Sequence, residues 1–77
     1  MIAKIEGTVL KSYEVKTKDR EGKEVMMPRI DLYDGNELVK VNKTPSVDHF
    51  AKGDYITLQV KIYANQYGLS VVYDSEL

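Results

Sequence analysis

A strict alternation of apolar and polar residues between positions 55 and 63 constrains the fold of this chain more than any other feature. Aliphatic side chains occupy every second position, and aromatic, charged or hydrogen-bonding side chains fill the positions between them. The two sets are Ile56, Leu58, Val60 and Ile62, and Tyr55, Thr57, Gln59, Lys61 and Tyr63. Successive side chains of a β-strand point to opposite faces of a sheet, so this period of two predicts a half-buried strand.

Four further segments predict strands on the same grounds: residues 3–16, 25–33, 37–41 and 69–73. In the first, the apolar side is predicted to carry Ala3, Ile5, Val9, Tyr13 and Val15. Leu10 and Lys11 interrupt its alternation, which indicates a change of register near that point. Pro28 lacks an N–H and predicts that the second strand lies at an edge or is interrupted there.

The connections between these strands predict a small barrel. Residues 16–24 are mostly charged and predict a projecting hairpin loop, Asp34-Gly35-Asn36 predicts a turn, and Thr44-Pro45 predicts a short helical turn between the third and fourth strands. The last residues, DSEL, are expected to fray. This order matches an all-β, five-stranded OB-fold-like Greek-key barrel, with an SH3-like barrel as the alternative.

Composition limits the classes of function. Seventy-seven residues make one domain, residues 1–77. The chain has no cysteine and one histidine, which excludes disulfides, thiolate zinc sites and His-cluster metal sites, so no metal and no cofactor are expected. No apolar run approaches the roughly 20 residues of a membrane span, and the N-terminus does not resemble a signal peptide. We therefore expect a cytoplasmic protein with no membrane partner.

The sequence predicts no enzyme and no small-molecule substrate. It contains neither a nucleophile elbow nor a phosphate-binding glycine loop. His49 has no partner that would make it a general base, so a surface or packing role is expected for it.

The polar face of residues 55–63 suggests a binding function instead. Bases of single strands stack on aromatic rings while cations contact the phosphates, and this face offers both kinds of group. Basic and aromatic residues of other strands and of the charged loop would extend the surface, although a solvated outer face remains the alternative. The candidate residues are Lys16, Lys18, Arg20, Arg29, Tyr33, Lys40, Lys61, Tyr63 and Tyr67. The net charge of −1 counts against such a function without excluding it.

Three blocks of the chain resemble the gene V-type single-stranded DNA-binding proteins of filamentous bacteriophages. The first is REGKE at 20–24, and the second runs from Ile30-Asp31-Leu32 through Gly35-Asn36-Glu37 to the strand Leu38–Val41. The third extends without a gap from Val41 to Tyr67 and includes Phe50-Ala51, Gly53, Tyr55 and Gln66-Tyr67-Gly68. Together the blocks cover residues 20–73.

This resemblance implies a dimeric OB-like barrel that binds single-stranded DNA cooperatively, with little sequence preference, to coat replicating DNA in a bacterial host cell. By position, Tyr67 matches a hairpin aromatic that stacks on bases, and Arg20 and Lys40 match basic residues that contact DNA. The chain departs from the family at Val25 and Arg29, which replace tyrosines, and at Asp74, which replaces a basic residue. A phage, a plasmid and a conjugative element all suit this pattern.

Two other functions remain open. A protein-interaction barrel would use Tyr55, Tyr63, Tyr67 and Val25 as a docking patch, since tyrosine is also enriched at protein interfaces. The other is an RNA-binding translational repressor, which only a competition between DNA and RNA would separate from a DNA-binding protein.

Overall fold

The partners of the first strand determine the architecture, because this strand pairs with two others along its length. The computed structural model describes residues 1–66 and 68–77. Its elements are β1 (Ile2–Lys18), β2 (Glu24–Tyr33), β3 (Leu38–Asn42), β4 (Tyr55–Asn65) and β5 (Gly68–Glu76). The beginning of β1 pairs with β4, and its second half pairs with β2, so one long, bent strand joins both sides of the sheet.

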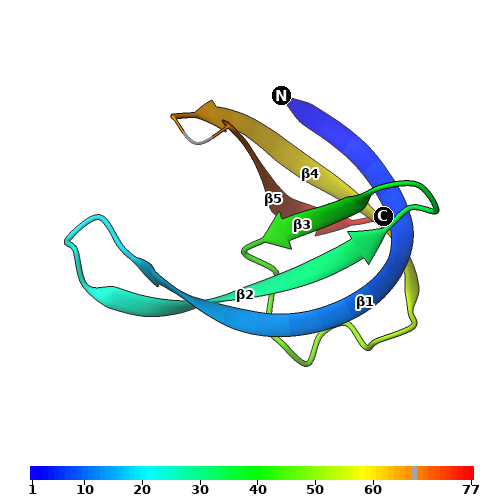
Figure 1. The fold of residues 1–77 in the computed structure, drawn as a ribbon, viewed down its shortest axis with the longest axis horizontal. Coiled ribbons are helices and arrows are strands. Elements are labelled where there is room, and N and C mark those ends of the chain that lie inside the picture. Colours follow the sequence, from blue (N-terminus) through cyan, green and yellow to red (C-terminus); the bar gives the residue numbers. More distant parts are fainter. Residues whose placement is uncertain (67) are drawn as a thin grey trace.

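The five strands close into a barrel in the order β1-β2-β3-β5-β4 (Figure 1). All neighbours are antiparallel except β3 and β5, which run parallel. Only two residue pairs form that parallel seam, Val41 with Val71 and Asn42 with Val72. The prediction of an all-β chain with five strands in one ring is confirmed.

The barrel interior holds the aliphatic faces that the alternation predicted. Its buried residues are Val9, Ile30, Leu32, Val41, Phe50, Ile56, Leu58 and Val60. Gly7 lies where β1 crosses the end of β2, and a Cβ at this position would lie 2.5 Å from the carbonyl oxygen of Tyr33. Only glycine allows the two backbones to approach so closely.

A bulge in β1 corrects the predicted side of two residues. The pairing with β2 shifts between Val9 and Lys11, so Leu10 is an extra residue in the ladder. After a bulge the alternation continues with opposite parity. Tyr13 and Val15 therefore pair with Arg29 and Met27, on the outer side of the sheet, and not on the side of the core as predicted. The register change expected near Leu10 is confirmed.

The connection from β3 to β4 contains no helix, so the predicted helical turn is wrong. Residues 43–54 form turns, and the amide of His49 donates one hydrogen bond to the carbonyl of Ser46 at 3.3 Å. Thr44 caps nothing: its amide donates to the carbonyl of Pro28, and its side chain is buried. The segment buries Phe50 and pairs Gly53 and Asp54 with Val9, and it follows an irregular path between these anchor points.

The end of the chain belongs to the barrel and does not fray. Strand β5 runs to Glu76, and the Leu77 amide donates to the carbonyl of Thr57 at 2.9 Å. His49 lies 3.2 Å from the Glu76 carboxylate and packs edge-on against Phe50, which ties the β3–β4 connection to this end. No helix in the described part of the chain is long and apolar enough to cross a membrane.

Two hairpins extend beyond the ring, toward the same side in the view of Figure 1. The β1–β2 hairpin, called the arm below, comprises residues 14–28 and has no β3 neighbour along Glu24–Pro28. This confirms the edge position that Pro28 predicted. The second is the hairpin of β4 and β5, whose tip follows Asn65.

Candidate functional site

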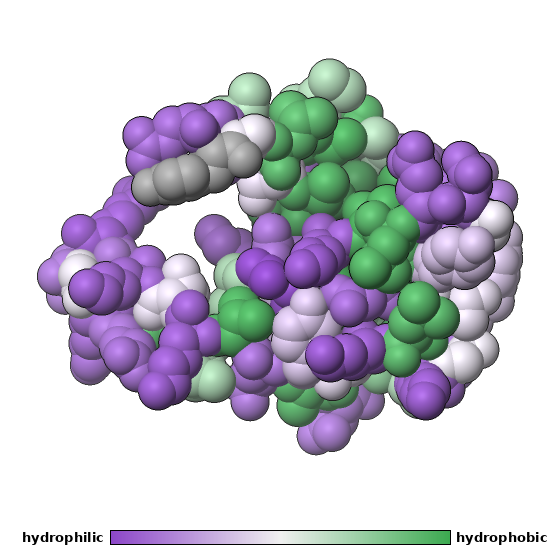
Figure 2. Space-filling model, viewed as in Figure 1, coloured by the Kyte–Doolittle hydropathy of each residue, from purple (hydrophilic) through white to green (hydrophobic). Residues whose placement is uncertain are grey.

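The main candidate site is a groove at the point where β3 and β5 separate. These strands pair only at their Val41–Val71 end, so the earlier residues of each diverge and leave a groove of about 400 Å³ between β3 and the β4–β5 hairpin. Figure 2 shows the molecule hollowed between the two projecting hairpins. The groove is lined by Arg29, Leu38, Val39, Lys40, Asn42, Asn65, Leu69, Ser70 and Val71.

A chain of side-chain hydrogen bonds crosses three strands at this groove. The Nε of Arg29 on β2 donates to the Oδ1 of Asn42 on β3 at 2.6 Å. The Nδ2 of Asn42 donates to the hydroxyl of Ser70 on β5 at 3.3 Å. The guanidinium plane is thus oriented by Asn42, and its remaining N–H groups are the kind of donors that bind phosphate.

Tyr13 lies beside Arg29 on the neighbouring strand. Its hydroxyl donates to the Asp31 carboxylate at 2.8 Å, and the Lys11 ammonium lies 4.6 Å from the centre of its ring. Burial, together with this hydrogen bond to Asp31, raises the pKa of the phenol. Tyr13 therefore remains a neutral donor at physiological pH, and its hydroxyl partly compensates the negative charge of Asp31.

Lys61 and Tyr63 continue the surface on β4. Lys61 forms a partly exposed ion pair with Asp74 at 3.6 Å, and Asp74 also accepts a hydrogen bond from Gln59 at 2.7 Å. Tyr63 is 51% exposed and pairs with Ser70 across the hairpin, so its ring is available next to the groove.

These side chains form one continuous surface, which we call the outer face. The pairing runs from Tyr13 to Arg29, Asn42, Val72 and Lys61 in a single row across the sheet. The charged residues of the face are Lys11, Arg29, Lys40 and Lys61, with Asp31 and Asp74. The face thus carries four of the 11 basic and two of the 12 acidic residues of the chain.

The structure brings together only part of the predicted set. Arg29 and Lys40 share the groove, and Lys61 and Tyr63 lie on the adjoining strand. Tyr33 is on the outer side of β2 but four residues from Arg29, which is about 13 Å along a strand. Tyr67 lies outside the described residues.

Three predicted site residues of the charged loop, Lys16, Lys18 and Arg20, lie on the arm, away from the outer face. Lys16 and Lys18 point to the side of the arm opposite the outer face. There Lys16 forms an ion pair with Glu24 at 3.7 Å, and the side chains of Lys16 and Glu24 are largely exposed. Arg20 lies in the turn at the tip of the arm. The Asp19 carboxylate stabilises this turn by accepting hydrogen bonds from the backbone amides of Glu21 and Lys23.

Sequence reasoning missed four contributors to this site. Tyr13 was assigned to the core, although the interruption at Leu10 carried the signal that reverses its side. Asn42, Ser70 and Leu69 had no signal of their own, because a parallel contact between β3 and β5 joins segments nearly 30 residues apart.

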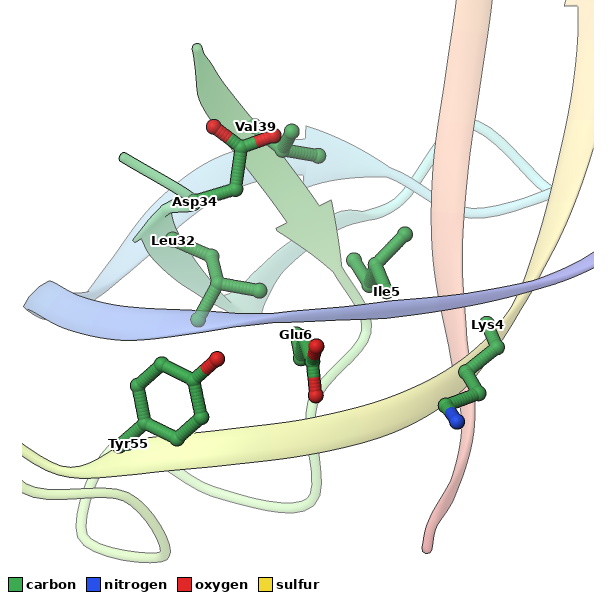
Figure 3. A pocket seen from close by; sticks show the side chains of 7 residues that line it. All are labelled: Lys4, Ile5, Glu6, Leu32, Asp34, Val39 and Tyr55. Atoms are coloured by element: carbon green, nitrogen blue, oxygen red, sulfur yellow. The ribbon is translucent and has the colours of Figure 1, made fainter. Parts of the chain in front are cut away.

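A second hollow, of about 340 Å³, lies near the β2–β3 turn (Figure 3). Its carboxylates come from Glu6 and Asp34, against one cation from Lys4, and Tyr55 also lines it. This balance makes the hollow a poor site for phosphate. Within the described residues, no three His, Cys, Asp or Glu side chains come together in a way that would hold a metal ion.

Comparisons with known proteins give no relative. No model of a protein family matches the chain, and neither the curated proteins nor the solved structures contain a significant match. The candidate site therefore depends on the geometry described above.

Proposed function

We propose that this protein binds single-stranded DNA without catalysing a reaction, and that the strand crosses the outer face and enters the groove. The observation that carries the proposal is the arrangement of Arg29, Lys40 and Tyr63. The two cations, from β2 and β3, line the groove, and the exposed ring of Tyr63 on β4 lies beside it, since Tyr63 pairs with Ser70 of the groove. Nonspecific binders of single strands combine a positive groove with stacking rings in this way.

The fold supports the same proposal. A closed five-stranded barrel with hairpins projecting beside the β2–β3 surface has the layout of an OB-fold, which binds oligonucleotides with that surface and with the β1–β2 and β4–β5 loops. The resemblance to gene V-type proteins adds a setting: coating of DNA during replication of a phage or another mobile element, in the cytoplasm of a bacterial host. It also assigns base stacking to Tyr67 and phosphate contact to Arg20.

A homodimer is part of the proposal, because the resembling family is dimeric. Sedimentation equilibrium of the purified chain tests this independently of DNA.

A protein-interaction module is the second candidate, favoured by the carboxylates of Asp31 and Asp74 among the cations. Partner proteins accept such mixed charge better than a polyanion does. An RNA-binding repressor is the third, and competition between oligo-dT and oligo-U at fixed salt separates it from a DNA-binding protein.

Substitution of Tyr63 by leucine tests the DNA-binding proposal. Stacking contributes on the order of 1–3 kcal/mol per base, so Tyr63→Leu should weaken binding of oligo-dT roughly tenfold or more, as measured by fluorescence anisotropy. Tyr55→Leu is the matched control, since Tyr55 is 67% exposed and lies on the same side of β4 at its other end. Equal effects of the two substitutions would contradict the proposal, as would binding of oligo-dT no tighter than that of a duplex.

A further inference from the structure

The arm has an open edge along β2, because β2 extends beyond the end of β3 (Figure 1). Strand β3 pairs with β2 only between Arg29 and Tyr33. Residues 24–28 therefore have β1 as a neighbour on one side and no strand of the described chain on the other. An open edge presents backbone N–H and C=O groups with which a further strand can pair.

One hydrogen bond of the arm shows which backbone groups face β1. The amide of Asp19 donates to the carbonyl of Lys23 at 3.0 Å, one step beyond the last pair of the β1–β2 ladder. Backbone groups alternate in direction along a strand, so the odd-numbered residues Val25 and Met27 also direct theirs toward β1. The even-numbered residues of this segment therefore direct their N–H and C=O groups toward the open side.

A second hydrogen bond, at the other end of the open segment, supports the same assignment. The carbonyl of Pro28 accepts the amide of Thr44, which follows β3, at 3.3 Å. By the alternation, the backbone groups of Glu24 and Met26 face the same side, and they have no partner among the described residues. Two donors and two acceptors are thus available there at the spacing of a strand.

A pocket of about 510 Å³ lies along this edge, and we call it the edge pocket. Strand β2 forms one wall, and the residues that follow β3 form the other. The walls are mostly apolar and include Val25, Met26, Met27, Pro28 and Pro45. Met26 is 50% exposed, so a segment that paired with the edge would cover apolar side chains as well as backbone groups.

The opposite edge of the arm differs in charge. Residues 14–18 of β1 include Glu14, Lys16 and Lys18, and charged side chains at an edge oppose pairing with other strands. Residues 24–28 of β2 include one charged side chain, that of Glu24, which forms an ion pair with Lys16 at 3.7 Å. The edge of β2 is therefore the better one for pairing.

We propose that the edge pocket receives an extended segment of a partner protein, which adds to β2 as a further strand. In this mode of recognition, backbone hydrogen bonds supply affinity, and pockets for alternate side chains supply specificity. The segment would place apolar side chains against the methionine and proline walls. Lys18 and Lys43 also line the pocket, so a carboxylate beside the apolar residues would complement them. This inference does not depend on DNA binding.

The edge favours a polypeptide over other occupants. Alternating donors and acceptors along Glu24 and Met26 match a second extended backbone, whereas a nucleic acid offers no such ladder. A second copy of this chain suits the pocket less well. Two arms paired about a two-fold axis would bring two sets of the same lysines, Lys18 and Lys43, to one interface, and like charges there would repel.

Hydrogen exchange of the full chain, read amide by amide by NMR, tests the open edge first. Without any peptide, the amide of Met26 should exchange at least about tenfold faster than those of Val25 and Met27, which bond to β1. Addition of the synthetic peptide acetyl-DVTVTVD-amide should then slow the exchange of Met26. The expected slowing is about tenfold at a peptide concentration about nine times the dissociation constant.

A proline substitution tests whether the backbone of the edge carries the binding. Met26→Pro removes an N–H that faces the open side and leaves the bonds between β1 and β2 in place, as edge strands tolerate. It should weaken binding of the peptide roughly tenfold, because one acceptor of the peptide is then unpaired. Met26→Leu is the matched control, since it keeps the N–H and an apolar side chain, and it should bind nearly as well as the wild type.

The same peptide with N-methylated amides provides a second test that needs no variant. It keeps the side chains and cannot donate to the edge, so it should not protect Met26. Equal protection by both peptides, or no protection at any concentration, would overturn the inference. Protection that rises with protein concentration alone would identify a second copy as the occupant, and equal protection by oligo-dT would identify a nucleic acid. Either result would also overturn it.

Discussion

At the scale of single residues, the buried hydroxyl of Thr44 lowers the stability of the fold. Its side chain is 4% exposed, and its hydroxyl finds no hydrogen-bond partner among the described residues. A buried donor without a partner loses its hydration and gains nothing in return.

We therefore predict that Thr44→Val stabilises the protein by about 1 kcal/mol, because the change removes the unpaired hydroxyl and keeps the branched shape. Chemical denaturation followed by circular dichroism measures the difference. Thr57→Val is the control: that hydroxyl donates to Glu6 at 3.4 Å and is partly solvated, so its removal should change stability little. A loss of stability in Thr44→Val would mean that the hydroxyl has a partner, such as a bound water.

At the scale of elements, the sequence predicted the strands well and their connections less well. Alternation identified β4 and its buried face because every inward position there is aliphatic. The arm was harder to predict, since the extra residue Leu10 reverses the sides of everything after it in β1. Pattern alone also favoured a helix at Thr44-Pro45, although Phe50 and the backbone pairing of Gly53 required an irregular path there.

The candidate site was predictable only where its residues share a strand with a clear period. Lys61 and Tyr63 belong to such a strand, and they were predicted. The link from Arg29 through Asn42 to Ser70 depends on how the ring closes, which no local pattern of residues encodes.

The turn between β2 and β3 makes stability depend on pH. The Asp34 carboxylate accepts the amides of Glu37 at 2.6 Å and Asn36 at 2.8 Å, and these bonds lower its pKa below 3.8. The stabilisation is therefore complete above pH 3.8 and is lost as pH falls through the lower folded-state value.

Asp34→Asn should accordingly destabilise the protein at neutral pH, and the difference from the wild type should shrink below pH 3.8. Urea denaturation at the two pH values measures this. Glu37→Gln removes a charge from the same turn and should have the smaller effect at neutral pH. An equal loss for Asp34→Asn at both pH values would show that the ionised carboxylate does not hold the turn.

At the scale of the whole molecule, the net charge conceals an uneven distribution. The outer face has two more basic than acidic residues, while the chain as a whole has one more acidic residue than basic ones. Affinity for a polyanion depends on the local set of cations that replace its counterions. A near-neutral chain is thus compatible with DNA binding.

The four cations of the outer face predict the salt dependence of binding. With about 0.7 counterion released per contact on a single strand, the slope of log affinity against log salt should be about −3 for a short oligo-dT. Anisotropy titrations over a range of salt concentrations measure it, with Arg29→Gln expected to reduce the magnitude by about 0.7. A slope near zero would exclude contact between this face and phosphates.

The short parallel seam has a consequence for how the protein moves. Two residue pairs between β3 and β5 are the smallest contact in the ring, so local opening should occur there at a lower free energy than global unfolding. The groove begins where this seam ends. A ligand that spans from Lys40 to Ser70 would therefore act as a clasp on the ring, and hydrogen exchange of the seam amides would slow in proportion to occupancy.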